Sequence, residues 1–206
     1  MDLNAENYDT PEALTAILNN YLCQWELQYG SVPSEQTLSL RFKGIISRAH
    51  LQTGLSVVVL VDEYDKPLLQ AIGNEPLADA YRAELKAFYG VLKSSDEHLK
   101  FVFLTGVTKF SQVSVFSDLN HLEDISLDSR YATICGITQE ELESNFVQGI
   151  NALAAANGQT KEETLEALRL RYNGYHFSET GASVYNPFST LNVLKKQKYL
   201  NYWFQT

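Results

Sequence analysis

The sequence predicts an α/β protein, with a parallel sheet flanked by helices and a small helical subdomain behind it. Residues 55–61 and 100–111 form two apolar stretches rich in Val, Leu and Phe, which is typical of strands buried on both faces of a parallel sheet. A helical pattern separates them, so the order indicates a βαβ unit. After Gly136 the strand patterns stop and helix signals follow, so we predict a core over residues 1–137 and a helical subdomain over residues 138–206.

Two helices are expected before the first strand. Thr10 is typical of an N-cap and Pro11 of a first helical residue, and apolar residues follow at helical spacing. This helix should end before Gly30. A second helix should begin after Ser34 and end at Gly54, since apolar residues again recur every three or four positions between them.

Further elements follow the first strand. The helix between the strands is marked by an apolar face of Leu77, Tyr81, Leu85, Phe88, Tyr89 and Leu92. We expect a third strand within residues 122–127. In the subdomain, Thr138 and Glu141 form a capping box that opens a helix, a second helix covers about 161–171, and a third begins at Asn186.

Polar residues follow both predicted strands. Asp62 and Glu63 come directly after the first strand, and Thr105 to Lys109 end the second. Ligands of βαβ units bind at the carboxyl ends of the strands, so we expect these residues to lie side by side. In nucleotide hydrolases an Asp at such a strand end holds hydrated magnesium, and a neighbouring Glu can act as general base on the attacking water. Thr105 or Thr108 fits the polar residue that senses the terminal phosphate.

Simpler interpretations of these residues stay open. The sequence DEYD, residues 62–65, also fits a solvated turn in which Asp62 or Asp65 caps the backbone. Lys109 fits a phosphate-facing cation and a surface lysine equally well. A PD-(D/E)xK nuclease site fails here, because Lys66 has a tyrosine two residues before it where the motif needs an acid.

Composition narrows the class of protein. A net charge of −9 argues against a nucleic-acid surface, because such binding depends on Lys and Arg contacts to phosphate. Cys23 and Cys135 have no CxxC spacing and the four histidines are scattered, so we expect reduced thiols and no zinc site. The start of the chain does not resemble a signal peptide, and no apolar run reaches the ~20 residues of a membrane span. We therefore expect a cytoplasmic protein.

Four blocks of sequence carry a resemblance to a known family. They are LSLRFKGIISRAHLQTGLSVVVLVDEYDKPLL, the stretch from AFYGVLKSSDEHLKFVFLTGVTKFS through SRYATICGITQEELE, LRYNGYHFS, and SVYNPFSTLNVL with the later NYWF. Together they resemble the AAA-ATPase-like family of bacterial proteins, many of which carry a PD-(D/E)xK nuclease-like domain near their C-terminus.

The resemblance implies an incomplete P-loop NTPase-type sheet and a set of roles. Asp62 and Glu63 would be the Walker B pair, with Asp62 holding Mg²⁺ through water and Glu63 as general base. Thr105 would be the sensor. Mg-ATP is the ligand that the family implies.

The chain departs from the family in one motif. The phosphate loop requires G-x-x-x-x-G-K-[ST], and none of the 11 glycines is followed by lysine. We therefore expect a truncated member, with a vestigial acidic pair, that holds no cofactor and neither binds nor hydrolyses ATP alone. Alternatives are a non-catalytic protein–protein interaction module and an ATPase half completed by a partner chain.

The missing motif has a consequence for the sheet. In this family the phosphate-loop strand lies beside the strand that ends at Thr105, so without it that strand should have an unpaired edge. Residues 122–127, a second copy of the chain or a separately encoded piece could pair there. We favour a homodimer through this edge.

Overall fold

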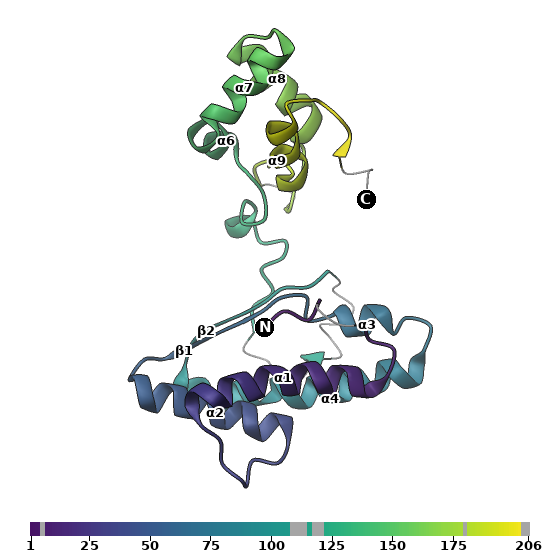
Figure 1. The fold of residues 1–206 in the computed structure, drawn as a ribbon, viewed down its shortest axis with the longest axis vertical. Coiled ribbons are helices and arrows are strands. Elements are labelled where there is room, and N and C mark those ends of the chain that lie inside the picture. Colours follow the sequence, from purple (N-terminus) through teal and green to yellow (C-terminus); the bar gives the residue numbers. More distant parts are fainter. Residues whose placement is uncertain (5–6, 108–114, 117–121, 179–180, 203–206) are drawn as a thin grey trace. The chain divides into compact units, whose positions relative to one another are not determined.

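The computed structural model describes most of the chain, namely residues 1–4, 7–107, 115–116, 122–178 and 181–202. Within them lie eight α-helices, two short 3₁₀ helices and a two-stranded parallel sheet, as the predicted α/β class requires (Figure 1). The chain divides into two compact units, Met1–Leu122 and Glu123–Thr206. The boundary at residue 137, where helix signals begin, stays a prediction.

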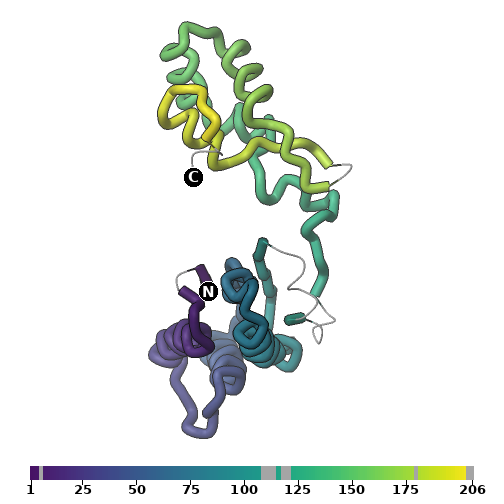
Figure 2. Tube along the Cα trace, turned by 90° about the vertical axis from the view of Figure 1, so that its right-hand side faces the viewer, coloured from purple at the N-terminus to yellow at the C-terminus, as the bar shows by residue number. Residues whose placement is uncertain are grey.

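Three long helices form the body of the first unit. They are α1 (Pro11–Tyr29), α2 (Leu38–Thr53) and α4 (Glu75–Ser94), and they pack side by side (Figures 1 and 2). Helix α2 begins later than predicted, because the Thr37 side chain accepts the Leu40 N–H at 3.2 Å and sets the N-cap there. Helix α2 ends, as predicted, at Gly54, whose φ of 68° favours glycine.

The predicted βαβ unit is confirmed. Strand β1 (Val57–Val61) and strand β2 (Leu99–Leu104) pair in parallel, with Val61 opposite Leu104. The connection between them contains α3 (Lys66–Gln70), α4 and the 3₁₀ helix η1 (Asp96–His98). Both strands are shorter than the apolar stretches that predicted them.

The prediction that the strands are buried on both faces is wrong for the described residues. Val59 and Val61 face the helices and are buried, whereas Val58 and Leu60 on the opposite face are 52% and 56% exposed. The three long helices of the first unit, α1, α2 and α4, lie on one side of the two strands (Figure 1). A continuous apolar run indicates that the side chains on both faces of a strand favour burial. In the described part of the first unit, helices cover only one of these faces.

The predicted third strand at residues 122–127 is also wrong. These residues are irregular, and the Asp124 carboxylate accepts the Ser126 N–H at 3.0 Å. The Asp128 N–H donates to the Ile125 carbonyl at 3.2 Å and closes a turn. Asp side chains that bond to their own backbone compete in this way with a strand ladder.

A short N-terminal segment pairs with the outer edge of β1. The Met1 nitrogen donates to the Leu60 carbonyl at 3.0 Å, the Asp62 N–H donates to the Met1 carbonyl at 2.9 Å, and the Leu3 N–H donates to the Asp62 carbonyl at 3.1 Å. Asp2 and Asp62 form a parallel bridge. The segment therefore runs in the same direction as β1 and extends the sheet at its carboxyl end.

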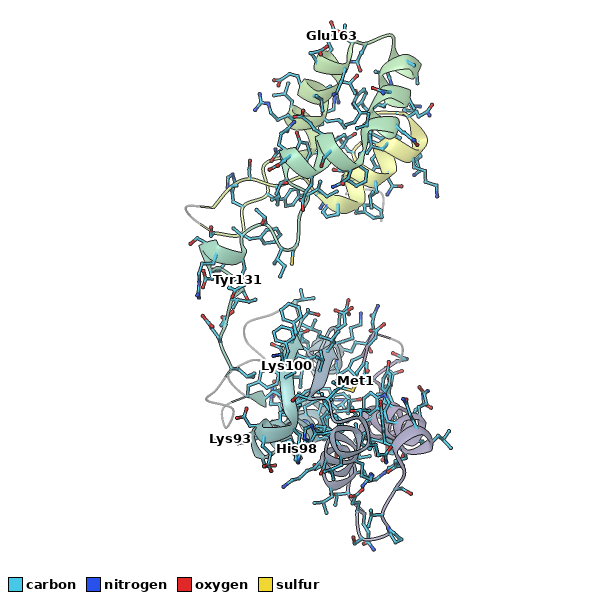
Figure 3. The ribbon with its side chains drawn as sticks, turned by 90° about the vertical axis from the view of Figure 1, so that its left-hand side faces the viewer. Met1, Lys93, His98, Lys100, Tyr131 and Glu163 are labelled. Carbon is cyan, nitrogen blue, oxygen red and sulfur yellow. The ribbon has the colours of Figure 1, made fainter. Side chains whose placement is uncertain are left out.

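The second unit is helical. It contains η2 (Ser129–Tyr131), α6 (Gln139–Asn145), α7 (Val147–Asn157), α8 (Lys161–Tyr172) and α9 (Pro187–Lys196). The capping box predicted at Thr138 is present, and Thr160 forms a second one with Glu163, which Figure 3 labels. In the described part of the chain no helix is long and apolar enough to cross a membrane.

Candidate functional site

The predicted site residues lie together at the carboxyl ends of β1 and β2. The Thr105 hydroxyl donates to the Asp62 carboxylate, and the same hydroxyl oxygen accepts the Glu63 N–H at 3.3 Å. One side chain that follows β2 thus contacts both acidic residues that follow β1. This arrangement follows from the parallel pairing of the two strands, which brings their carboxyl ends to the same edge of the sheet.

Main-chain hydrogen bonds fix the positions of these residues. The Thr105 N–H donates to the Val61 carbonyl at 2.8 Å, and the Tyr64 N–H donates to the Thr105 carbonyl at 2.9 Å. Glu63 has a φ of 52°, in the left-handed region that residues other than glycine seldom occupy. Such a conformation costs on the order of 1–3 kcal/mol and persists where surrounding bonds hold it, as they do here.

The two carboxylates differ in their surroundings. Asp62 is exposed to solvent. The Glu63 side chain is 34% exposed, and its Oε2 atom lies 4.0 Å from the Lys66 Nζ atom. Both groups are open to a ligand, and carboxylate and hydroxyl oxygens are the donor types that a hard cation such as Mg²⁺ prefers.

The described side chains of the site can supply only some of the ligands that a magnesium ion needs. In the described residues no group of three or more His, Cys, Asp or Glu side chains could hold a metal ion. A magnesium ion that accompanies a nucleotide needs only one or two carboxylates, because phosphate oxygens and water complete its coordination. Asp62 and Thr105 fit that limited role. Thr108 and Lys109, the other predicted phosphate-side residues, lie outside the described residues.

Asp65 is the residue whose importance the sequence signalled least clearly. It is fully buried, and its two carboxylate oxygens lie 3.1 and 3.0 Å from the Val107 nitrogen, whose N–H they accept. It therefore joins the segment after β1 to the segment after β2. The sequence offered a cap at this position only as one alternative, and the burial of Asp65 and of Tyr64 beside it is visible only in the structure.

Close packing next to Asp65 explains why residue 106 is a glycine. A Cβ atom on Gly106 would lie 2.5 Å from Tyr64 Cε1 and 2.7 Å from Asp65 Oδ1. Any larger residue would push the loop after β2 away from Asp65. Gly106 thus keeps Thr105 close to the acidic pair.

Comparisons with known proteins identify relatives of this chain. A family model described as "Predicted AAA-ATPase" matches residues 1–116. An uncharacterised protein in the vnfD 5′ region of Azotobacter chroococcum mcd 1 is 43% identical over 166 residues, which is 81% of this chain and 30% of that relative. This chain thus spans about a third of the length of the curated relative. No solved structure matches.

Proposed function

Because the chain belongs to the AAA-ATPase-like family, we propose that it carries the metal-side half of an ATP site and does not bind or hydrolyse ATP by itself. One observation carries the proposal: the Thr105 hydroxyl bonds to the Asp62 carboxylate and to the Glu63 N–H at the ends of two adjacent parallel strands. The motif that would cradle the phosphates does not occur among the 206 residues.

Each residue of the cluster has a proposed role. Asp62, exposed at the end of β1, would hold Mg²⁺ through a water molecule. Glu63 would accept a proton from the attacking water, once its carboxylate turns away from Lys66. Thr105 would orient Asp62 and contact the terminal phosphate. Bound Mg-ATP would supply the phosphoryl group and neutralise part of the charge of the acidic pair.

The absence of the loop motif sets the expected affinity. A phosphate loop supplies several charge-assisted hydrogen bonds, each worth roughly 1.5–3 kcal/mol. Losing three of them costs on the order of 5–9 kcal/mol, or about a thousandfold to a millionfold in affinity. A site that would be micromolar with the loop is therefore expected to have a Kd in the millimolar range or weaker without it.

A second candidate function is an ATPase half that a partner completes. The observation in its favour is the outer edge of β2: within the described residues, β2 pairs only with β1. A phosphate-loop strand from another chain could pair with that edge. A third candidate is an interaction module, favoured by the exposed apolar residues Val58, Leu60 and Phe101 on the open face of the sheet.

The roles of the acidic pair are tested in a polypeptide that contains a phosphate loop. The DNA directly upstream of Met1 is first read for an in-frame strand and Gly-Lys-Ser loop. If it encodes them, the longer protein is assayed with Glu63→Gln, which should keep Mg-ATP binding and lower hydrolysis at least about a hundredfold. Unchanged hydrolysis in this variant would contradict the role of Glu63.

If the upstream DNA encodes no such loop, the same assay is performed on this chain with the protein that co-purifies with it. Hydrolysis by that complex, lost with Glu63→Gln, would favour the second candidate function. A complex that forms equally well with Glu63→Gln and hydrolyses nothing would favour the interaction module.

A further inference from the structure

We propose that Asn173 is a site of spontaneous modification, at which the side-chain amide is lost as ammonia and the residue becomes an aspartate or an isoaspartate. The reaction consumes only water and does not depend on ATP binding. Asparagine amides are thermolabile, and two Asn-Gly pairs occur in the sequence, Asn157-Gly158 and Asn173-Gly174. The structure orients the second pair for this reaction and holds the first pair away from it.

The reaction starts at the main-chain nitrogen of the following residue. After losing its proton, the Gly174 nitrogen attacks the Asn173 Cγ atom and closes a succinimide ring, and the bond from Cγ to Nδ2 breaks as ammonia leaves with a proton. Water then opens the ring at one of its two carbonyls. One opening leaves an aspartate, and the other leaves an isoaspartate, whose main chain runs through the former side chain. Glycine favours ring closure because it has no Cβ atom in the way.

The Asn173 side chain lies in position for this attack. Asn173 directly follows α8 (Figure 1) with a ψ of 167°, and its Oδ1 atom accepts the Gly174 N–H at 2.6 Å. The Cγ atom is one C=O bond of about 1.23 Å from Oδ1, so it lies no more than about 3.8 Å from that nitrogen. Reacting atoms about 3–3.5 Å apart are close to the geometry of attack. Gly174 has a φ of 113°, and a Cβ atom there would meet no atom within 4 Å, so the ring has room to form.

A buried tyrosine orients the other end of the amide. Burial raises the pKa of the Tyr185 phenol, and a hydrogen bond with the Asn173 side chain opposes that rise. A bond that favours the charged phenolate comes from a donor, which in asparagine is the Nδ2 group. The Tyr185 hydroxyl in turn donates to the Gln139 side chain of α6. With Nδ2 directed to Tyr185, the Oδ1 atom stays directed to Gly174.

The other pair, Asn157-Gly158, has the opposite arrangement. Asn157 is the last residue of α7, and its Nδ2 atom donates to the Leu153 carbonyl at 2.8 Å and to the Gln197 carbonyl at 3.2 Å. Helical side chains point toward the N-terminus of the helix, so the Asn157 amide is directed away from the nitrogen that follows it. The Gly158 N–H donates to carbonyls of the last helical turn. The fold should therefore slow the reaction at Asn157.

Conversion at residue 173 would alter the connection that follows α8. On either side of it, the Asn186 N–H donates to the Tyr172 carbonyl at 3.0 Å and the Val184 N–H donates to the Tyr175 carbonyl at 2.9 Å. An isoaspartate lengthens the main chain between these bonds by one CH₂ group, so the two bonds cannot both keep their present register. We therefore expect the conversion to loosen this part of the second unit.

The experiment compares the two pairs within one molecule. The full chain is incubated in mildly alkaline buffer, either folded or unfolded in guanidinium chloride, and tryptic peptides are analysed by mass spectrometry with fragmentation. Trypsin separates the pairs because it cleaves after Lys161. In the folded chain, conversion at Asn173 should be at least about tenfold faster than at Asn157. In the unfolded chain, where no fold orients either side chain, the two rates should agree within about threefold.

Three results would overturn the proposal. The first is equal conversion of Asn157 and Asn173 in the folded chain. The second is a difference that survives unfolding, since it would then come from the neighbouring residues in the sequence. The third is a folded-state rate at Asn173 that is more than about tenfold below its unfolded-state rate, since the fold would then hinder the attack.

Matched variants test the structural consequence. Asn173→Gln keeps an amide but would need a larger ring, so it should stay unmodified, whereas Asn157→Gln should convert at Asn173 as fast as the wild type. Each protein is compared with its own sample before incubation. Exchange of the Val184 N–H should become at least about tenfold faster in incubated wild type and should not change in incubated Asn173→Gln. Equal acceleration in both proteins would contradict the assignment to residue 173.

Discussion

Three carboxylates follow β1 within four residues, and their surroundings assign them different tasks. Asp62 is exposed and bonds to a single hydroxyl, Glu63 is half-buried beside Lys66, and Asp65 is buried against the Val107 N–H. An exposed carboxylate can exchange partners with a ligand, whereas a buried one holds the backbone. We therefore propose that Asp62 and Glu63 act in the site, whereas Asp65 holds the backbone of the fold.

Replacing Asp65 should destabilise the protein, and replacing Asp62 should not. Asp65→Ala leaves the Val107 N–H without its acceptor and should lower the free energy of unfolding by about 1–3 kcal/mol. Asp62→Ala, the matched control, should change it by no more than about 0.5 kcal/mol because the side chain is exposed. Urea unfolding followed by circular dichroism measures both. Equal losses would contradict the division of roles.

A second residue-scale prediction concerns the ion pair between α1 and α2. The Arg41 guanidinium donates two hydrogen bonds of 2.8 Å to Glu26 and lowers the pKa of that carboxyl, and the side chains are only 16% and 15% exposed. Because the pKa is lower in the folded state, the pair stabilises the protein above pH 4.5, the ordinary value of a glutamate, and this stabilisation is lost as pH falls through the folded pKa.

The variant Glu26→Gln tests this pH dependence. The difference in unfolding free energy between the wild type and the variant should be about 1–2 kcal/mol at pH 6 and should shrink as pH is lowered toward 3. Other carboxylates titrate in both proteins, so the comparison isolates Glu26. A difference that stays constant with pH would contradict the assignment.

At the scale of the elements, most helices were predictable, although α3 and α7 were not predicted, and the environment of the strands was not predictable. Local signals set helix limits: Pro11 starts α1, Gly54 ends α2, and the boxes at Thr138 and Thr160 start α6 and α8. The burial of β1 depends instead on which elements cover each face, and a single stretch of sequence does not contain that information. The prediction of a strand at residues 122–127 was wrong for a related reason. The Asp124 side chain bonds to the nearby main chain, and this local bond competes with hydrogen bonds to a strand distant in sequence.

The cap of α8 gives the clearest element-scale test. The Thr160 hydroxyl accepts the Glu163 N–H at 3.1 Å, and the Glu163 carboxylate accepts the Thr160 N–H at 2.9 Å. Thr160→Ala should lower the stability of the second unit by about 1 kcal/mol, whereas Thr160→Ser should be nearly neutral because it keeps the hydroxyl. Thermal unfolding of the two variants compares them, and an equal loss in both would show that the hydroxyl does not act as the cap.

At the scale of the whole molecule, the sheet has more surface than the described residues cover. The strand pairing that brings Asp62, Glu63 and Thr105 together could be predicted from the βαβ order. Three other features could not be predicted, because each depends on residues far apart in sequence. They are the left-handed conformation of Glu63, the contact of Asp65 with Val107, and the apolar groove that Val57 to Leu60 of β1 help to line. Within the described residues, β2 pairs only with β1, and the face of the sheet that carries Val58, Leu60 and Phe101 is exposed.

The open edge of β2 predicts self-association, as the sequence led us to propose. The Thr105 N–H points toward β1, so in the regular part of the ladder the N–H of Val102 points away from β1, and Val102→Pro should remove one donor from that edge without removing a hydrogen bond to β1. Sedimentation velocity should show a dimer for the wild type and for Val102→Ala, and more monomer for Val102→Pro. A monodisperse wild-type monomer would contradict this prediction.

The most direct test of the central claim is isothermal titration calorimetry of Mg-ATP into the purified chain, with Asp62→Ala as control. We expect no binding heat up to millimolar ATP in either protein, because the sequence contains no phosphate loop. Binding by the wild type that is lost in Asp62→Ala would contradict the claim, and would mean that another part of these 206 residues holds the phosphates.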